Sequence, residues 1–179
     1  LPTTRSELMA VKSLIETVTV GAGGAASIEF TAIPQEAGSD LILVISSRLD
    51  GAQYEGKIQF NSDTASNYSS LYLYGNGAGE YSGLSTGVSL IFQGMGRSSA
   101  TANTFASDTI YVSNYTSAVA KSISIDAVSE NNDAADYSYI LSIGSGKWSG
   151  TAAITSLRIF STENFVQYST ASLYKIKYD

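Results

Sequence analysis

The sequence contains neither cysteine nor histidine, and each absence excludes a class of chemistry. Without cysteine there is no disulfide, no thiolate nucleophile and no metal site built on thiolates. Without histidine the chain lacks the commonest general base, the commonest metal ligand and the side chain that titrates near neutral pH. Any catalysis would have to rely on carboxylates or on Ser/Lys chemistry.

Charged residues, prolines and long apolar runs are also scarce. Only 15% of the 179 residues are charged, the net charge is -6, and there are 2 prolines. Nucleic-acid backbones and anionic membranes attract clusters of Lys and Arg, so we expect neither as a partner. No window approaches the length of apolar sequence that spans a membrane, and the N-terminus lacks the pattern of a secretory signal, so we expect neither of these segments.

Short alternating segments fill most of the chain. Serine and threonine make up roughly a quarter of it, and tyrosine outnumbers phenylalanine by 12 to 6, a mixture that favours strands and turns. The C-terminal stretch predicts two closing strands, at 153–160 and 170–178, separated by a turn at 161–164. In the second of these strands apolar side chains alternate with Lys175 and Lys177, as expected for a sheet with one polar face.

The strand count predicts the fold class. The run LILVI at 41–45 is short and rich in β-branched residues, which predicts a central strand buried on both faces. The glycine-rich region 75–107 predicts exposed loops with a single strand at 88–92. In all, the pattern predicts about nine or ten strands without a fixed repeat. We therefore expect an all-β protein, an antiparallel β-sandwich of jelly-roll type over residues 15–179, with an immunoglobulin-like sandwich as the second possibility.

The first fourteen residues differ from the rest and predict a separate N-terminal arm, 1–14. Thr4 followed by Glu7 has the spacing of a capping box, and Leu8, Val11 and Leu14 fall near one face of a helix. The segment is therefore expected to form a short helix or, alternatively, an extended arm. Such a segment can pack on its own domain or dock on a neighbouring subunit.

The remaining chemistry does not form a recognisable catalytic set. Acids such as Asp108 and Asp126 could act in a glycosidase only if two of them flanked a cleft at the proper separation. No nucleophile elbow or S-x-x-K set is present, and the Gly144–Lys147 stretch is too short for a phosphate-binding loop. We therefore predict that the chain is not an enzyme and needs no cofactor.

Two loops carry enough oxygen ligands for calcium to be considered. The first contains Asn61, Asp63 and Thr64, and the second contains Glu130, Asn131, Asn132, Asp133 and Asp136. Neither loop has the spacing of an EF-hand. Side chains that bond their own backbone in tight turns explain the composition equally well, so we predict no metal site.

Tyrosines could form a binding surface. Leu71 and Leu73 alternate with Tyr72 and Tyr74, so one strand is expected to have an aliphatic face and an aromatic face. Further tyrosines occur in or near predicted strands at positions 111, 115, 137 and 139. Such rings could stack on sugars or on a protein partner, but we favour the interpretation that they cover a half-buried sheet.

Several stretches resemble a broad group of virion proteins of tailed bacteriophages and prophages that have a jelly-roll-like β domain. They are SIEFTAIPQEAGSDLILVISSR (27–48), IQFNSDTASNYSSLYLYGNG (58–77), ANTFASDTIYVSNYTSAVAKSISIDAVSENN (102–132) and KWSGTAAITSLRIFSTENFVQYSTASLYKIK (147–177). The resemblance extends over nearly the whole chain from about Ile15 onward. It departs from the group at Lys175, where a glycine is expected after Tyr174, and at residues 1–8, which precede the usual domain start at a methionine such as Met9.

The resemblance implies assembly and not catalysis. It implies a capsid decoration (cement) protein on the outer surface of the virion, which binds the major capsid protein and copies of itself, with a homotrimer as the natural expectation. The alternative is a tail-fibre or receptor-binding domain that recognises a host-surface glycan or protein. The absence of an obvious shaft or coiled coil favours decoration. We expect the arm residues Leu8, Val11 and Leu14 to anchor the domain to its partner.

Overall fold

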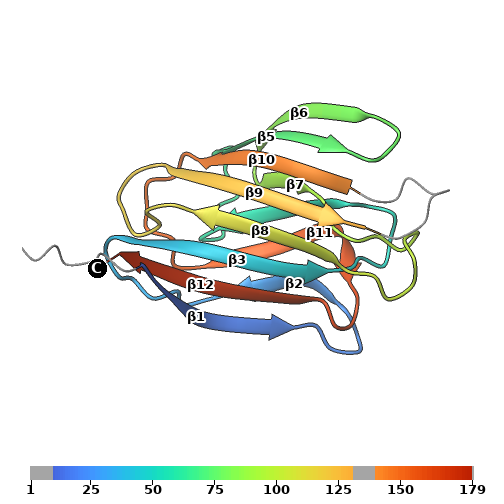
Figure 1. Cartoon of the computed structure of the whole chain (residues 1–179). Helices are drawn as coiled ribbons and strands as arrows, with labels where there is room; N and C mark the ends of the chain where they lie inside the picture. The colour runs from blue at the N-terminus through green and yellow to red at the C-terminus, as the bar shows by residue number, and fades with distance from the viewer. Residues whose placement is uncertain (1–9, 131–139, 179) are drawn as a thin grey trace, which may run out of the picture.

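The computed structural model describes residues 10–130 and 140–178, and within them the chain forms strands and no helix (Figure 1). The strands are β1 (Ala10–Thr19), β2 (Ala25–Phe30), β3 (Ser39–Ser47), β4 (Glu55–Phe60), β5 (Tyr68–Gly75), β6 (Glu80–Gly87), β7 (Leu90–Gln93), β8 (Ala106–Val112), β9 (Lys121–Ser129), β10 (Ile140–Trp148), β11 (Leu157–Phe165) and β12 (Thr170–Tyr178). The all-β, antiparallel sandwich predicted from the sequence is confirmed. The jelly-roll type stays a prediction.

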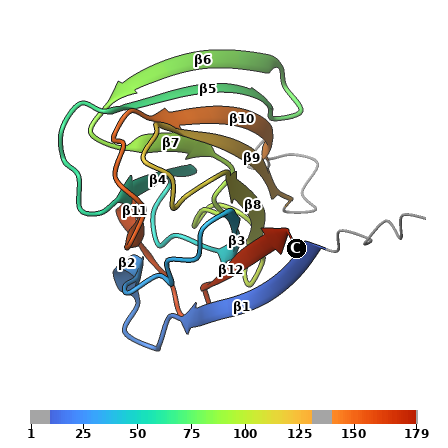
Figure 2. The ribbon, with the colours of Figure 1, turned by 90° about the vertical axis from the view of Figure 1, so that its left-hand side faces the viewer.

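Two antiparallel sheets face each other. The larger has eight strands in the order β1-β12-β3-β8-β9-β10-β5-β6, and the smaller has four in the order β2-β11-β4-β7. The larger sheet curves around the smaller one, with β1 and β6 at its two edges (Figure 2). We call the side of the larger sheet that faces the smaller sheet its inner face and the opposite side its outer face.

Alternation along the strands assigns side chains to these faces. In β9 every second residue is buried: Ile123, Ile125 and Ala127 lie on the inner face, and the residues between them are exposed. The same alternation occurs in β8, where Ile110 and Val112 are buried. The core therefore lies between the two sheets, and the outer face of the larger sheet meets solvent.

The apolar run at 41–45 forms the middle of β3, between β12 and β8. Its central position is confirmed, but its burial on both faces is not. Leu41, Leu43 and Ile45 are each 1% exposed on the inner face, whereas Ile42 and Val44 are only half-buried on the outer face. Within residues 10–130 and 140–178 no second layer covers them, since the four-stranded sheet lies on the inner side.

An aromatic cluster closes one end of the core. The rings of Phe60, Tyr68 and Trp148 have centroids between 5.6 and 6.4 Å apart. The Trp148 indole N–H donates a hydrogen bond of 2.7 Å to Asp63, whose carboxylate also accepts bonds from the Ala65 backbone and the Asn67 side chain. These three donors, the Asn67 amide first, lower the pKa of Asp63. The loop before β5 is thus tightly built, as predicted.

Two basic side chains hold loops by binding backbone carbonyls. The Arg48 guanidinium donates to the carbonyl oxygens of Ser98, Ala100, Thr101 and Thr104. The buried Lys121 ammonium donates to the carbonyl oxygens of Ser117, Val119 and Ala152. Charged donors make stronger hydrogen bonds than neutral ones, so each side chain fixes a loop that has no sheet partner of its own.

The structure describes residues 10–14 of the predicted N-terminal arm, 1–14. Residues 10–14 are the first half of β1, which pairs with β12 from Ala10 opposite Tyr178 to Thr19 opposite Thr170. A helix there is wrong, and the boundary expected between residues 14 and 15 falls inside the strand. The exposed edge of β12 offers a hydrogen-bond partner along the whole segment, and this tertiary pairing overrides a weak local helix preference. Leu8 and the Thr4–Glu7 pair lie outside the described residues.

Two other strand predictions are corrected. The region 75–107, expected to contain one strand, contains both β6 and β7. The turn expected at 161–164 lies inside β11, which runs to Phe165 with an irregularity in its pairing after Phe160. Polar residues are compatible with a strand when the neighbouring strand supplies the ladder, as β5 does for β6. Residues 161–164 instead form an irregularity between the Phe160–Ser27 and Phe165–Ala25 pairs, where Asn164 bonds to Asp50.

Asp108 is a buried carboxylic acid on the inner face of β8. Its side chain is 0% exposed, and its direct neighbours in the sheet are Ile45 and Ala127. Within the described part of the chain no hydrogen bond of good geometry satisfies either carboxyl oxygen, and the only polar group acting on them as a donor is the Val128 backbone N–H. Burial raises the pKa of Asp108 well above its usual range, because desolvation penalises the charged form.

We predict that Asp108→Asn stabilises the protein in a pH-dependent manner. A raised pKa in the folded state means that the folded chain retains a proton that the unfolded chain loses, so wild-type stability falls as pH rises from about 4. The neutral amide avoids this loss, and the variant should gain about 1–3 kcal/mol in free energy of unfolding at pH 8, and less at pH 4. Urea denaturation across this pH range measures it.

The control is Glu16→Gln, which neutralises an exposed acid on β1, away from the core and from β5 and β6, and should leave the pH profile nearly unchanged. Equal pH profiles for wild type and Asp108→Asn would contradict the assignment of a protonated Asp108.

Candidate interaction surface

Five large aliphatic side chains lie together on the outer face of the eight-stranded sheet, each more than half exposed. They are Leu71 (55%) and Leu73 (55%) on β5, Leu84 (72%) on β6, and Leu141 (64%) and Ile143 (56%) on β10. We call this set the outer aliphatic patch. Single exposed aliphatic residues are common on proteins, but a contiguous group is typical of a binding surface.

The register of the strands brings these residues together. Leu71 is paired directly with Leu84, and Leu73 is paired with Ile143. Residues two apart on one strand share a face, so Leu141 extends the group along β10. Leu141 is in turn paired with Val128 of β9, which is 37% exposed. The patch therefore crosses four adjacent strands without interruption.

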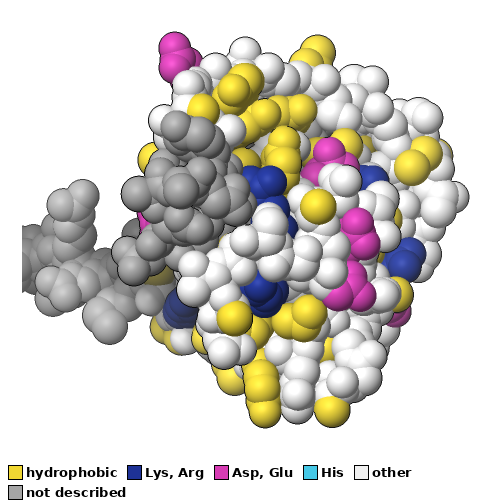
Figure 3. All heavy atoms as spheres, turned by 90° about the vertical axis from the view of Figure 1, so that its right-hand side faces the viewer, with side chains coloured by type: hydrophobic (Ala, Val, Ile, Leu, Met, Phe, Trp, Pro, Cys, Tyr) yellow, Lys and Arg dark blue, Asp and Glu magenta, His cyan; other side chains and the backbone are white. Residues whose placement is uncertain are grey.

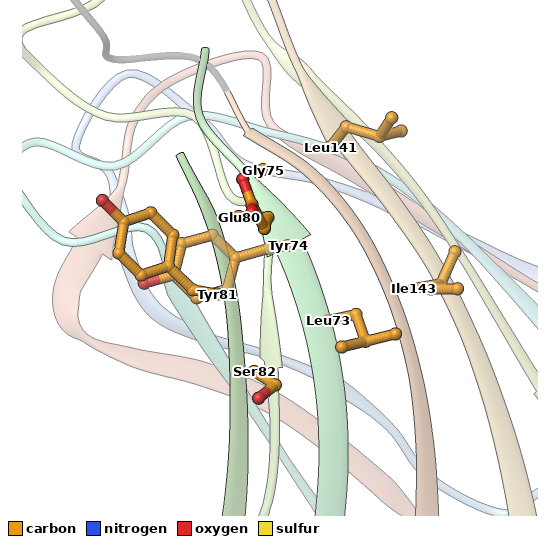
Figure 4. A pocket seen from close by; sticks show the side chains of 8 residues that line it. All are labelled: Leu73, Tyr74, Gly75, Glu80, Tyr81, Ser82, Leu141 and Ile143. Carbon is orange, nitrogen blue, oxygen red and sulfur yellow. The ribbon is translucent and has the colours of Figure 1, made fainter. Parts of the chain in front are cut away.

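The patch is hollowed between β5, β6 and β10. A shallow depression of about 520 Å³ is lined by Leu73, Tyr74, Gly75, Glu80, Tyr81, Ser82, Leu141 and Ile143 (Figure 4). Its lining is mostly apolar. Leu73, Leu141 and Ile143 point to one side of the sheet, and the rings of Tyr74 and Tyr81 point to the other (Figure 4). This depression can accept an apolar side chain of a partner.

The opposite side of β5 and β6 carries a tyrosine cluster. Tyr74 and Tyr81 are paired across the strands, and their rings stack with centroids 5.0 Å apart. The ring centroids of Tyr54 and Tyr74 are 6.2 Å apart. The Arg97 guanidinium lies over the Tyr54 ring, with its central carbon 4.9 Å from the ring centroid. A hydrogen bond with Tyr54 and partial burial raise the pKa of Tyr74 to about 12, so the Tyr74 hydroxyl stays protonated at neutral pH.

Gly83 on β6 leaves room for the Tyr72 ring of β5. Gly83 is paired with Tyr72, and a Cβ atom added at Gly83 would lie 2.5 Å from the Tyr72 ring. The ring therefore occupies the space that a side chain at this position would need. The alternation of Leu71 and Leu73 with Tyr72 and Tyr74 thus separates an aliphatic outer face from an aromatic inner face, as the sequence predicts.

The predicted anchor residues lie elsewhere. Val11 and Leu14 are 49% and 56% exposed, but both are on β1, at the edge opposite β6. Val11 is paired with Lys177 and Leu14 with Tyr174, and residues three apart in a strand point to opposite faces. The two side chains therefore form no common stripe, and Leu8 lies outside the described residues.

Most of the patch was missed in the sequence. The alternation at Leu71 and Leu73 is visible there, and it indicates one aliphatic face. Leu141 and Ile143 also alternate with polar residues, but no local signal tells that their strand pairs with the one that carries Leu73. Leu84 is a lone apolar residue in a segment of small polar residues and carries no signal at all.

The first calcium candidate is occupied by protein groups. Asp63 accepts hydrogen bonds from three donors, and the Asn61 side-chain oxygen accepts bonds from the backbones of Thr155 and Ser156. These oxygens already accept hydrogen bonds from protein donors that hold the loop in place. Of the second candidate, all residues except Glu130 lie outside the described residues. Within residues 10–130 and 140–178, no group of three or more acidic side chains could hold a metal ion.

No family model matches this chain, and no curated protein matches it in sequence. Over the part of the chain that the structure covers, no helix is long and apolar enough to cross a membrane.

We predict that Gly83→Ala destabilises the protein, because the new methyl group would collide with the Tyr72 ring. The loss in free energy of unfolding should be about 1–3 kcal/mol, the usual cost of overpacking. Gly75→Ala is the matched control: the nearest atom lies 3.8 Å from its Cβ position, so the change should stay within about 0.5 kcal/mol.

Tyr72→Ser should relieve the collision, so the double variant with Gly83→Ala should lose less stability than the two single losses added together. Urea denaturation measures all four variants. Equal stabilities for the two glycine variants would show that the ring moves aside without cost.

Proposed function

We propose that the chain is a structural protein of a tailed-bacteriophage particle that assembles through protein–protein contacts on the outer aliphatic patch. Its first candidate role is capsid decoration, in which it binds the outside of the capsid and stabilises the lattice of the major capsid protein. The observation that carries the proposal is the contiguous aliphatic surface across β5, β6, β9 and β10. The resemblance of the sequence to virion proteins supplies the type of particle.

The energetics favour an assembly surface. Fully burying a leucine or isoleucine side chain contributes about 1.5–3 kcal/mol, so covering the exposed parts of five such residues contributes several kcal/mol before the cost of association. The patch is shallow and broad, as in protein–protein interfaces, and small-molecule sites are usually deeper. A protein that assembles once and stays in place is well served by such a surface.

The acidic composition limits the partners. A net charge of -6 opposes binding to nucleic acid and to anionic membranes, both of which need clustered basic residues. The proposed partners are therefore protein surfaces: the major capsid protein and further copies of the chain.

The decoration role predicts the copy number. In purified particles, quantitative mass spectrometry should find about one chain per major capsid subunit, because a lattice-wide protein follows the lattice symmetry. A handful of copies per particle would support the fibre role instead. Absence of the chain from particles would overturn the proposal.

The decoration role also predicts that the chain attaches to particles through the outer aliphatic patch. The double variant Leu73→Ser and Ile143→Ser should reduce occupancy of particles at least about tenfold, because it removes two central aliphatic contacts. The matched control is Val11→Ser with Leu14→Ser, which removes two equally exposed aliphatic side chains at the opposite edge of the sheet. If the control lowers occupancy and the patch variant does not, the anchor lies on β1 and the assignment to the patch is wrong.

A second candidate is favoured by the tyrosine cluster. The stacked rings of Tyr74 and Tyr81 can bind the apolar faces of sugar rings, and the Arg97 guanidinium over the adjacent Tyr54 ring can hydrogen-bond their hydroxyls. This arrangement supports a tail-fibre domain that recognises a host-surface glycan. Tyr81 is 46% exposed and accessible, so Tyr81→Ala should abolish adsorption to host cells if this role is correct and should leave capsid binding unchanged.

A further inference from the structure

We propose that the outer aliphatic patch is covered by the same patch of a second copy, in a two-fold dimer whose sheets pack face to face with antiparallel strands. This inference rests on the proposed function, which makes the patch an assembly surface, and it names the partner. It depends on how charge is distributed along the strands of the patch.

One end of the patch is basic. Lys147 is exposed on the outer face of β10, and its sheet neighbours across β5 and β6 are Ser69 and Thr86. No acidic side chain contacts Lys147 among the described residues. The Lys147 ammonium therefore stands at the end of the aliphatic surface with only hydroxyl side chains beside it in the sheet.

The other end is acidic. Leu141 of β10 is paired with Gly75, which is paired with Glu80 of β6. Glu80 is exposed and lines the apolar depression. The rows that contain Lys147 and Glu80 are six residues apart along the strands, which corresponds to roughly 20 Å.

The two middle rows on β10, β5 and β6 carry no charge. One row holds Ser145, Leu71 and Leu84, and the next holds Ile143, Leu73 and Ser82. On these three strands the patch thus has an uncharged middle and opposite charges at its two ends, and Asp126 of β9 lies at its side. A space-filling view shows apolar side chains gathered at the upper side of the molecule, where β5, β6 and β10 lie (Figure 3).

Such a surface complements itself in one orientation. A two-fold axis that lies between the two sheets and runs perpendicular to the strands places the basic end of each patch over the acidic end of the other. This pairing of opposite ends then occurs twice in one interface. A two-fold axis parallel to the strands would place the two Lys147 side chains at the same end, where their charges repel. Charge complementarity therefore selects the antiparallel arrangement.

The same orientation accommodates Asp126, the charged residue beside the middle rows. Asp126 is paired with Ile143, and the antiparallel axis places the Ile143 row of one copy over the Leu71 row of the other. On β9 that second row holds Ser124. Each carboxylate then faces a hydroxyl, which can donate a hydrogen bond, and not another carboxylate.

The size of the surface suits a reversible dimer. Four strands spaced by about 4.8 Å and about eight residues long give a sheet area of roughly 500 Å² in plan, and projecting side chains add to the accessible area. A standard interface buries about 800 Å² per partner, so this surface is near that size. Packing it against an identical sheet can cover neighbouring members of the patch together, because the patch is continuous across adjacent strands.

The first test is the association state of the purified full chain, measured by sedimentation velocity and light scattering over a range of concentrations. We expect a monomer–dimer equilibrium for the wild type. Leu73→Ser with Ile143→Ser should weaken the dimer at least about tenfold, and Val11→Ser with Leu14→Ser should not change it. Circular dichroism checks that all variants are folded.

The second test uses charge reversal to examine the orientation. Lys147→Glu and Glu80→Lys should each weaken the dimer about fivefold or more, because each replaces two attractions with two repulsions. Mixing the two variants should restore dimerisation, since every contact between unlike copies is then between opposite charges. High salt should reduce this restoration.

Several outcomes would overturn the inference: a wild type that stays monomeric at about 100 μM, a trimer, or a dimer that responds to the β1 variants and not to the patch variants. If the mixture of charge variants does not associate, the antiparallel orientation is wrong. A monomeric wild type whose patch variants still lose particle occupancy would leave the proposed function standing and remove the second copy as the partner. If the chain dimerises as expected but is absent from particles, the dimer would stand and the proposed function would be overturned.

Discussion

The pairing of β10 with β5 on one side and β9 on the other determines what each face of the larger sheet presents. Side chains in a strand alternate between the two faces of the sheet. The same register therefore places Ser142 and Trp148 on the inner face and Leu141 and Ile143 on the outer face. A shift of β10 by one residue would bury Leu141 and Ile143 and expose Trp148. The core and the interaction surface are therefore two results of one register.

The register itself is held in place from the inside. Trp148, at the last residue of β10, packs against Phe60 and Tyr68 and donates its indole hydrogen bond to Asp63. This contact fixes the end of the strand against a loop that is stabilised by its own hydrogen bonds. A partner that binds the outer face thus meets a surface that is already ordered, which reduces the entropic cost of association.

The sequence allowed the fold class and the central strand to be predicted, because strongly alternating or strongly apolar segments carry their own signal. The aliphatic face at Leu71 and Leu73 was also predictable, since one strand suffices to define it. The rest of the patch was not, because Leu84 and Ile143 join it only through pairing between distant segments. The helix alternative for residues 10–14 failed for the same reason, and the segment is extended: a helical spacing at Val11 and Leu14 has less influence than the free edge of β12.

The pairing of β1 with β12 also places the two ends of the described chain next to each other. Ala10 lies opposite Tyr178, at one corner of the eight-stranded sheet, while β6 forms the far edge. Neighbouring termini at the surface are the geometry that permits circular permutation and the display of fused domains. Any chain that continues from Ala10 or from Tyr178 leaves the sheet at this one corner, six strands from β5 on β1 and five on β12, at the edge away from the outer aliphatic patch.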